Sequence, residues 1–291
     1  MVDNKVIDYT FEFVDTYIPQ WFETGTKGPL FIYVSGPQGS GKTFTSQKLY
    51  EHLVSQYGEE KNIALASIDD FYLTHEAQIS LNSQYPNNKL LQGRGLPGTH
   101  DMSLLNSCLR SILQSESNGE DKDTVLLPRY DKSKFNGEGD RSEEVARVKL
   151  PVDIFILEGW FLGFNPILGN LGEEVETMVE GDMIDVNAKL FMYGDLMWKN
   201  PEIHSLGIVF DTDDINNVYE WRLEQEHRSI ELNGSGMTNE KVKLFVDKYF
   251  PCYQLYYEAL VRSENLGSIA TLTLGIDLNR NTYSTKTRSI E

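Results

Sequence analysis

The sequence is poor in cysteine, poor in basic residues relative to acidic ones, and free of long apolar runs. Only two of its 291 residues are cysteine, Cys108 and Cys252, and their separation matches no zinc or disulfide motif, so we expect reduced, buried thiols. The 26 Lys and Arg residues stand against 44 Asp and Glu, a formal net charge of −18, which argues against a nucleic-acid-binding surface. No stretch approaches the roughly 18 uninterrupted apolar residues of a membrane helix, so no membrane partner is predicted.

The first residues also lack the basic segment and apolar run of a secretory signal. We therefore expect a cytoplasmic protein, and the sequence leaves entry into the nucleus open. The negative charge does not exclude a local basic pocket that attracts a small anion.

Short apolar runs alternate with helical patterns along the chain, and hydrophobic residues make up 40% of it. This alternation predicts an α/β fold in which helices cover both faces of a parallel sheet. The predicted strands are residues 30–35, 62–68, 153–157, 206–210 and 269–274. The predicted helices are residues 6–21, 43–57, 102–113, 183–198 and 215–232. We expect residues 1–291 to form a single domain, with an N-terminal helix in 1–28 packed on it and a helical insertion at 160–200.

Three polar stretches interrupt this pattern. Residues 129–149 and 233–240 are charged and contain glycine, and we interpret them as mobile loops over a site, although ordinary solvated loops explain either one equally well. The tail from residue 278 to 291 is polar, and we expect it to be flexible.

One motif carries the clearest chemical signal. The pattern G-x-x-x-x-G-K-[ST] follows the strand predicted at 30–35 and begins the helix predicted at 43–57. Glycines let successive N–H groups face a phosphate, the lysine reaches the β- and γ-phosphates, and the threonine hydroxyl ligates Mg²⁺. The motif consists of Gly36, Pro37, Gln38, Gly39, Ser40, Gly41, Lys42 and Thr43. It predicts a P-loop that binds a nucleoside triphosphate.

A second polar segment follows the next predicted strand. Asp69 and Asp70 precede Phe71 and Tyr72, and strand carboxyl ends of a doubly wound sheet face one ligand crevice, so Asp69 should lie near the P-loop. A carboxylate there can accept the proton of a substrate hydroxyl that attacks the γ-phosphate. Capping of the next helix or binding of Mg²⁺ explains an Asp-Asp pair at a strand end equally well.

Together with the P-loop, this segment resembles the phosphoribulokinase, uridine kinase and pantothenate kinase group of P-loop kinases. Further segments make the sequence most similar to plant-type D-glycerate 3-kinase and its fungal and bacterial relatives. These segments are Arg94–Asp101 (RGLPGTHD), Leu127–Asp131 (LPRYD), Leu157–Trp160 (LEGW) and Trp221–Leu223 (WRL). The resemblance covers about residues 30–266, and it implies the P-loop NTPase fold with a mobile lid.

The resemblance also implies roles around the transferred phosphate. Asp69 matches the catalytic carboxylate, Lys42 the phosphate contact, and Thr43 and Glu158 the residues at the magnesium ion. A helix-capping or loop carboxylate is the alternative for Glu158.

The resemblance is less specific about the residues that bind the acceptor. The matching positions are Asp70, Tyr72, Arg94, Thr99, His100, Asp101 and Arg129. Arg94, Arg129 and Lys132 are candidates for holding a carboxylate or phosphate of the acceptor, because an anionic substrate must be attracted to an acidic protein. The alternative for each of these cations is a surface ion pair, and the alternative for His100 is a purely structural role.

The lid is predicted around the helix at 215–232. Arg222 and Arg228 are the candidates that close over the phosphate, and because six residues separate them they do not share one helical face. We expect at most one of them to face the phosphate, unless the helix ends between them.

These observations predict an ATP- and Mg²⁺-dependent kinase that phosphorylates a hydroxyl of a small, glycerate-like metabolite. The partners implied are ATP and that acceptor, for a monomer or weak homo-oligomer. One alternative is a kinase for a nucleoside, a pantothenate-like molecule or a sugar phosphate. Another is a non-catalytic ATP-binding regulator, against which the presence of Lys42, Thr43, Asp69 and Glu158 argues.

Overall fold

The computed structural model describes residues 4–114, 123–169, 171, 180–233 and 237–290. Its centre is a six-stranded sheet with the strand order β2-β5-β1-β6-β7-β8. The first five strands in this order are parallel, as predicted, and β8 is antiparallel to β7. The strands are β1 (Leu30–Ser35), β2 (Ile63–Ser67), β5 (Ile154–Gly159), β6 (His204–Thr212), β7 (Ala270–Ile276) and β8 (Thr282–Ser289).

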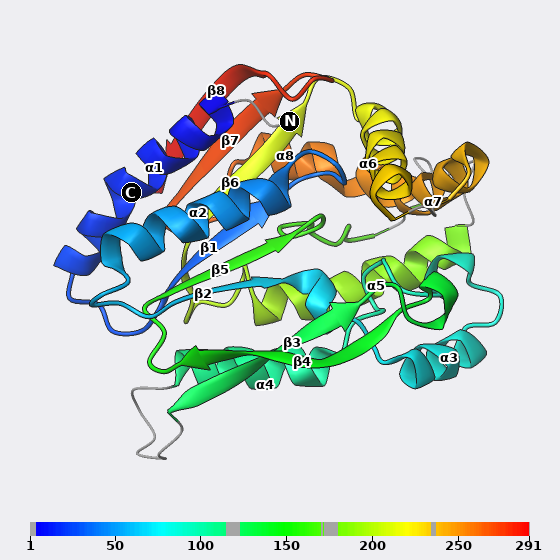
Figure 1. Cartoon of the computed structure of the whole chain (residues 1–291), viewed down its shortest axis with the longest axis horizontal. Coiled ribbons are helices and arrows are strands. Elements are labelled where there is room, and N and C mark those ends of the chain that lie inside the picture. The colour runs from blue at the N-terminus through cyan, green and yellow to red at the C-terminus, as the bar shows by residue number, and fades with distance from the viewer. Residues whose placement is uncertain (1–3, 115–122, 170, 172–179, 234–236, 291) are drawn as a thin grey trace.

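Helices cover both faces of this sheet (Figure 1). On one face lie α1 (Asn4–Glu23) and α2 (Lys42–Tyr57), and on the other lie α5 (Glu180–Leu196) and α8 (Glu258–Ser263). Strands β1 and β5 are buried along their whole length, because a sheet covered on both faces needs apolar residues at every position. The continuous apolar runs in the sequence therefore predicted these two central strands correctly. No described helix is long and apolar enough to cross a membrane.

Residues 129–149 do not form the loop that we predicted. They belong to an antiparallel hairpin of β3 (Thr124–Asp131) and β4 (Asp140–Lys149), which lies beyond the β2 edge of the main sheet together with α4 (Met102–Leu113) (Figure 1). The prediction was wrong because β4 is largely solvent-accessible and its charged residues hide the strand pattern.

The polar tail is also ordered rather than flexible. Residues 282–289 pair with β7 as the edge strand β8, and an edge strand with one solvated face tolerates the Thr, Ser, Lys and Arg side chains found there. The expectation of a flexible tail was therefore wrong.

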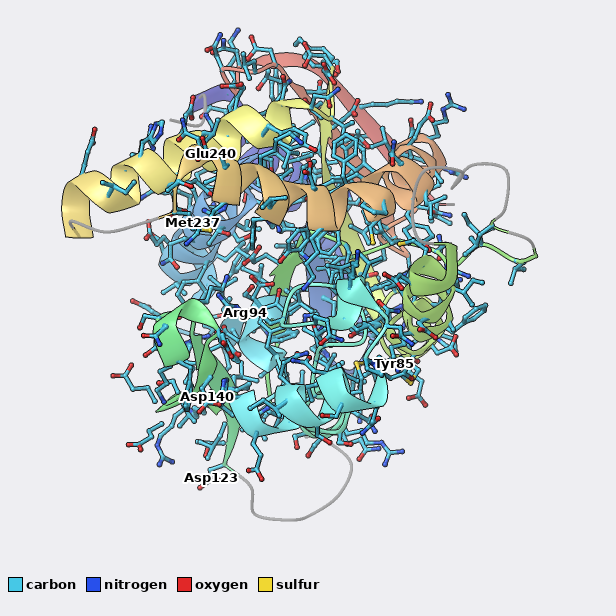
Figure 2. The ribbon with its side chains drawn as sticks, turned by 90° about the vertical axis from the view of Figure 1, so that its right-hand side faces the viewer. Tyr85, Arg94, Asp123, Asp140, Met237 and Glu240 are labelled. Atoms are coloured by element: carbon cyan, nitrogen blue, oxygen red, sulfur yellow. The ribbon has the colours of Figure 1, made fainter. Side chains whose placement is uncertain are left out.

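Further helices surround the carboxyl ends of the parallel strands. They are α3 (His75–Gln84), α6 (Asn217–Asn233) and α7 (Asn239–Cys252), with a π-helical turn at Tyr253–Tyr257 after α7. Figure 2 looks at this end of the molecule, with Met237 and Glu240 on the α6–α7 side, Asp140 on the opposite side and Arg94 between them. The region between these two sides contains the candidate site.

Candidate active site

The phosphate-loop motif forms the turn between β1 and α2. Gly39 and Gly41 have φ angles of 81° and 103°, in the left-handed region that favours glycine. A Cβ atom on Gly39 would lie 2.4 Å from the Cβ of Trp221, so this position also excludes any side chain. The loop therefore takes its shape both from its own glycines and from the packing of α6.

Two residues far away in sequence hold this loop. The amide of Gln38 donates to the Tyr253 hydroxyl over 3.1 Å, and Nε of Arg280 donates to the carbonyl of Gly39 over 2.7 Å. The Arg280 guanidinium also forms an ion pair with Glu224 at 2.8 Å. Tyr253 and Arg280 belong to no motif, so sequence reasoning missed them.

Lys42, Asp69 and Glu158 form a charged group at the ends of β1, β2 and β5. Burial lowers the pKa of Lys42, and the charges of Glu158 and Asp69 oppose that shift. Burial raises the pKa of Glu158, whereas Lys42 lowers it. Glu158 is 6% exposed, and its Oε2 has no hydrogen-bond partner among the described residues. The structure thus brings the predicted phosphate, base and metal residues together.

Both carboxylate oxygens of Asp69 are engaged. The Tyr72 hydroxyl donates to Oδ1 over 2.9 Å, and the ammonium of Lys132 lies 2.6 Å from Oδ2. Burial alone would raise the pKa of Asp69, but the charge and hydrogen bond of Lys132, with Lys42, lower it to about 2. Asp69 is therefore a carboxylate over the whole physiological pH range.

Asp70 and Arg129 are partners of each other. Their ion pair measures 2.8 Å, and the second carboxylate oxygen of Asp70 accepts the amide of Tyr130 over 3.1 Å. These contacts attach strand β3 to the segment that carries Asp69. The ion pair corresponds to the alternative that the sequence left open for Arg129.

Thr99 and Asp101 also form contacts within the chain. The Thr99 hydroxyl donates to the carbonyl of Leu96 and accepts the amide of Gly95, which shapes a tight, buried turn. Asp101 accepts the amide of Leu104 at the start of α4 and pairs with Arg141 at 3.0 Å.

His100 lies between two tyrosines. Oη of Tyr193 accepts the amide of Gly98 over 2.8 Å and shares a hydrogen bond with Nδ1 of His100 over 2.9 Å. Nε2 of His100 has no hydrogen-bond partner among the residues that the structure describes. Burial lowers the pKa of His100 from 6.5 to about 4, against the opposing charge of Asp69. His100 is thus a neutral imidazole with one ring nitrogen, Nε2, still available for a hydrogen bond.

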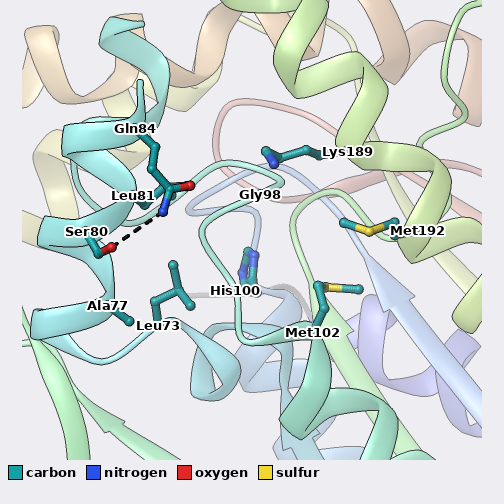
Figure 3. Close-up of a pocket in the computed structure, with 10 residues that line it drawn as sticks. All are labelled: Leu73, Ala77, Ser80, Leu81, Gln84, Gly98, His100, Met102, Lys189 and Met192. Atoms are coloured by element: carbon teal, nitrogen blue, oxygen red, sulfur yellow. Dashed lines mark hydrogen bonds between the residues drawn. The ribbon is translucent and has the colours of Figure 1, made fainter. Parts of the chain in front are cut away.

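His100 also contributes to the wall of a cavity of about 400 Å³ between α3, α5 and the start of α4 (Figure 3). The lining is mostly apolar, and Lys189 is its charged member. The lining residues are Leu73, Ala77, Ser80, Leu81, Gln84, Gly98, His100, Met102, Lys189 and Met192.

Arg94 and Lys248 are bound to backbone carbonyls. The guanidinium of Arg94 donates to the carbonyls of Gly137 and Glu138 at the tip of the β3–β4 hairpin. The ammonium of Lys248 donates to the carbonyls of Gln92, Gly93 and Arg94, and burial lowers its pKa to about 8. Lys248 connects α7 to the segment that follows α3, a connection that sequence reasoning missed.

Both lid arginines lie on α6, which continues without interruption from one to the other. Arg222 pairs with the buried Glu226 at 2.9 Å and lies over the ring of Phe245, 5.0 Å from its centroid. Arg228 is exposed. Residues 234–236 of the predicted lid loop lie outside the described residues.

Comparison with known proteins places this geometry in a family. No protein-family model matches the chain. It is 67% identical over 288 residues to the probable ATP-dependent kinase TDA10 of Saccharomyces cerevisiae, covering 99% of this chain and 98% of that protein. The structure of D-glycerate 3-kinase from Cryptococcus neoformans matches with a TM-score of 0.83 and 33% identity, over 97% of this chain and 99% of that one.

The chain belongs to the family of ATP-dependent P-loop kinases that includes D-glycerate 3-kinase. The chloroplastic D-glycerate 3-kinase of Arabidopsis thaliana is 34% identical over 256 residues, covering 86% of this kinase and 53% of the plant protein. The fold, the use of ATP and the kinase activity follow from this membership.

Proposed function

We propose that this kinase transfers the γ-phosphate of ATP to a hydroxyl of a small, glycerate-like acid, in a reaction that depends on Mg²⁺. One observation carries the proposal: a D-glycerate 3-kinase matches 97% of the chain at a TM-score of 0.83. The plant D-glycerate 3-kinase supports it at the level of sequence. The acceptor therefore belongs among small molecules with an alcohol group.

In the proposed reaction, Asp69 receives the proton of the acceptor hydroxyl. The hydroxyl oxygen forms a bond to the γ-phosphorus, and the bond from phosphorus to the bridging oxygen breaks as ADP leaves. Lys42 neutralises charge on the phosphates, and the amides of the loop bind them. Of the two lid arginines, we propose Arg222 as the one that acts. It lies over the ring of Phe245, which packs against Tyr249, and the Tyr249 hydroxyl lies next to Gly95 of the acceptor segment.

The residues present fit a magnesium ion. Glu158 offers a buried oxygen that lacks a partner among the described residues, and Thr43 begins α2 with a hydroxyl next to Lys42. Mg²⁺ prefers oxygen ligands and is held in such kinases by few protein groups together with water and phosphates. When bound, the ion would neutralise charge that develops on the β- and γ-phosphates. No cluster of three or more His, Cys, Asp or Glu side chains suited to a metal occurs in the described part of the chain.

On the acceptor side, we propose that Nε2 of His100, which lacks a partner among the described residues, forms a hydrogen bond with the acceptor. Asp70, Thr99, Asp101, Arg94 and Arg129 already form contacts within the chain, and we propose that they shape the site around Tyr72 and His100.

The test is the release of ADP from Mg·ATP with D-glycerate, pantothenate, uridine and ribulose 5-phosphate offered separately. We expect D-glycerate to stimulate release strongly and the other three to leave it near the level without acceptor. Stimulation by one of the other three compounds would show that it is the acceptor in place of D-glycerate, and the kinase activity would still stand. If ATP binds and none of the four stimulates release, the proposed acceptor class is wrong and the regulator alternative gains support.

A further inference from the structure

Lys132 occupies an unusual position for a lysine that is 57% exposed. Its ammonium lies 2.6 Å from Oδ2 of Asp69, and among the described residues it forms hydrogen bonds only with this carboxylate. The other oxygen of Asp69 accepts the Tyr72 hydroxyl. In this arrangement, each oxygen of Asp69 already accepts one hydrogen bond, and the ammonium of Lys132 stabilises the charged form, so Asp69 is a weaker base toward an attacking hydroxyl or water.

Apart from Lys42 of the phosphate loop, the cations near the segment that carries Asp69 bind other groups. Arg94 donates to two hairpin carbonyls, Arg129 pairs with Asp70, and Arg141 binds Asp101 and the carbonyl of Tyr72. Moving any of them would leave a carboxylate or a backbone carbonyl without its partner. Lys132 differs because the one partner of its ammonium among the described residues is the carboxylate of Asp69, the proposed catalytic base.

The backbone on both sides of Lys132 is fixed, so only its side chain can move. The amide of Tyr130 binds Asp70, and the amide and hydroxyl of Ser133 donate to Asp131 at 2.9 and 2.6 Å. A lysine carries its charge on a flexible four-carbon chain, so it can change partners while its backbone stays in place.

We propose that the ion pair between Lys132 and Asp69 holds back the base until the anionic group of the acceptor binds Lys132 in place of Asp69. We call this ion pair the latch. Without acceptor, the ion pair makes Asp69 a poorer base toward water, which slows wasteful hydrolysis of ATP. A carboxylate on the acceptor takes over the ammonium of Lys132, and Oδ2 of Asp69 becomes free to accept the proton of the acceptor hydroxyl. This inference rests on the proposed function and adds the reason for which the acceptor must be an acid.

Charge balance explains the selectivity. When an acidic acceptor binds, one ion pair replaces another, so the ammonium keeps a counter-ion throughout. A neutral acceptor would have to break the pair with Asp69 and offer no charge in return, which costs about the strength of a charge-assisted hydrogen bond. The latch therefore favours hydroxy acids over alcohols of the same size.

The experiment compares the wild type with Lys132→Met and with Lys134→Met as a matched control. Lys134 lies two residues away and donates to the carbonyl of Arg141, so its replacement removes the same charge from the same hairpin. ADP release is measured without acceptor, with D-glycerate and with its uncharged methyl ester. Thermal unfolding of each variant verifies that it is folded, and Lys132→Arg, which keeps the charge, serves as a conservative variant.

For Lys132→Met we expect the KM for D-glycerate to rise about 10- to 100-fold. ADP release without acceptor should rise several-fold, and the preference for the acid over its ester should disappear. Lys134→Met should behave like the wild type, and Lys132→Arg should keep hydrolysis suppressed. An unchanged KM for D-glycerate in Lys132→Met would show that Lys132 does not bind the acceptor carboxylate. Unchanged or slower hydrolysis of ATP without acceptor would show that the ion pair does not restrain Asp69.

Failure of the latch and failure of the proposed function give different results. If the wild type does not phosphorylate D-glycerate, the proposed acceptor is wrong, while the hydrolysis rates without acceptor still decide the latch. If the wild type accepts the ester as well as the acid, the selectivity argument is wrong although the kinase activity stands.

Discussion

The ring of His100 lies on the ring of Tyr72, with the two centroids 4.4 Å apart and an angle of 24° between the planes. The Tyr72 hydroxyl in turn donates to Asp69. The segment that we assign to the acceptor is thereby attached directly to the proposed catalytic carboxylate. A change at His100 should therefore affect both the stability and the chemistry of the site.

The stability of the protein should depend on the protonation of His100. Its pKa falls from 6.5 to about 4 in the folded state because of burial, so the unfolded chain binds more protons between these values. The stability that neutral His100 contributes is present above pH 6.5 and is lost as the pH falls toward 4. Urea unfolding of the wild type and His100→Gln should show their difference in unfolding free energy shrinking by about 2 kcal/mol between pH 7 and pH 5.

A difference that stays constant over this range would show that His100 does not change its pKa on folding. The acceptor role has a separate readout, since His100→Gln at pH 7.5 should raise the KM for D-glycerate more than the KM for ATP.

Asp69→Asn should abolish most of the turnover. The amide cannot receive a proton, and a general base contributes about 10²- to 10⁴-fold to the rate, so kcat should fall by that factor while ATP affinity stays near the wild-type value. Asp153→Asn is the matched control, because Asp153 pairs with Lys61 at the opposite end of β5. Turnover that survives in Asp69→Asn would show that this carboxylate is not the base.

Gly39→Ala should prevent nucleotide binding. The new Cβ would combine a positive φ with a 2.4 Å approach to Trp221, so the loop or α6 must move. Gly25→Ala is the comparison, because Gly25 has a φ of 65° and open space around it, which leaves only a backbone cost of about 1–2 kcal/mol. Calorimetric titration with ATP should show a large loss of affinity for Gly39→Ala alone, and equal affinities would contradict the packing argument.

Arg222→Ala should reduce kcat more strongly than Arg228→Ala. Arg222 is held by Glu226 over the ring of Phe245, whereas Arg228 is exposed. An arginine that stabilises the transferred phosphoryl group is worth about 10³-fold or more in kcat, so we expect losses that differ by at least about tenfold. Single-turnover rates measure this step directly, and the reverse order would assign the role to Arg228.

The sequence predicted the parts of the fold that depend on local signals. The apolar run at 30–35 coincides with β1, and the motif that follows it forms the turn before α2. These predictions succeed because a strand buried on both faces and a glycine-rich phosphate loop each need particular residues at consecutive positions.

The remaining features depend on distant pairing. The β3–β4 hairpin and β8 are polar strands whose partners decide their conformation, so their sequences resemble loops. The contact of Lys132 with Asp69 joins residues 63 positions apart, and the link from Arg280 to Gly39 spans 241. No spacing rule connects such residues, and only the packed structure brings them together.

The most direct test of the account is the ³¹P NMR spectrum of a mixture of the wild type, Mg·ATP and D-glycerate. We predict a new phosphomonoester signal that grows as the γ-phosphate signal of ATP declines, and its absence when Asp69→Asn replaces the wild type. A spectrum in which the wild type yields only inorganic phosphate, or no change at all, would contradict phosphate transfer to the hydroxyl of this acid.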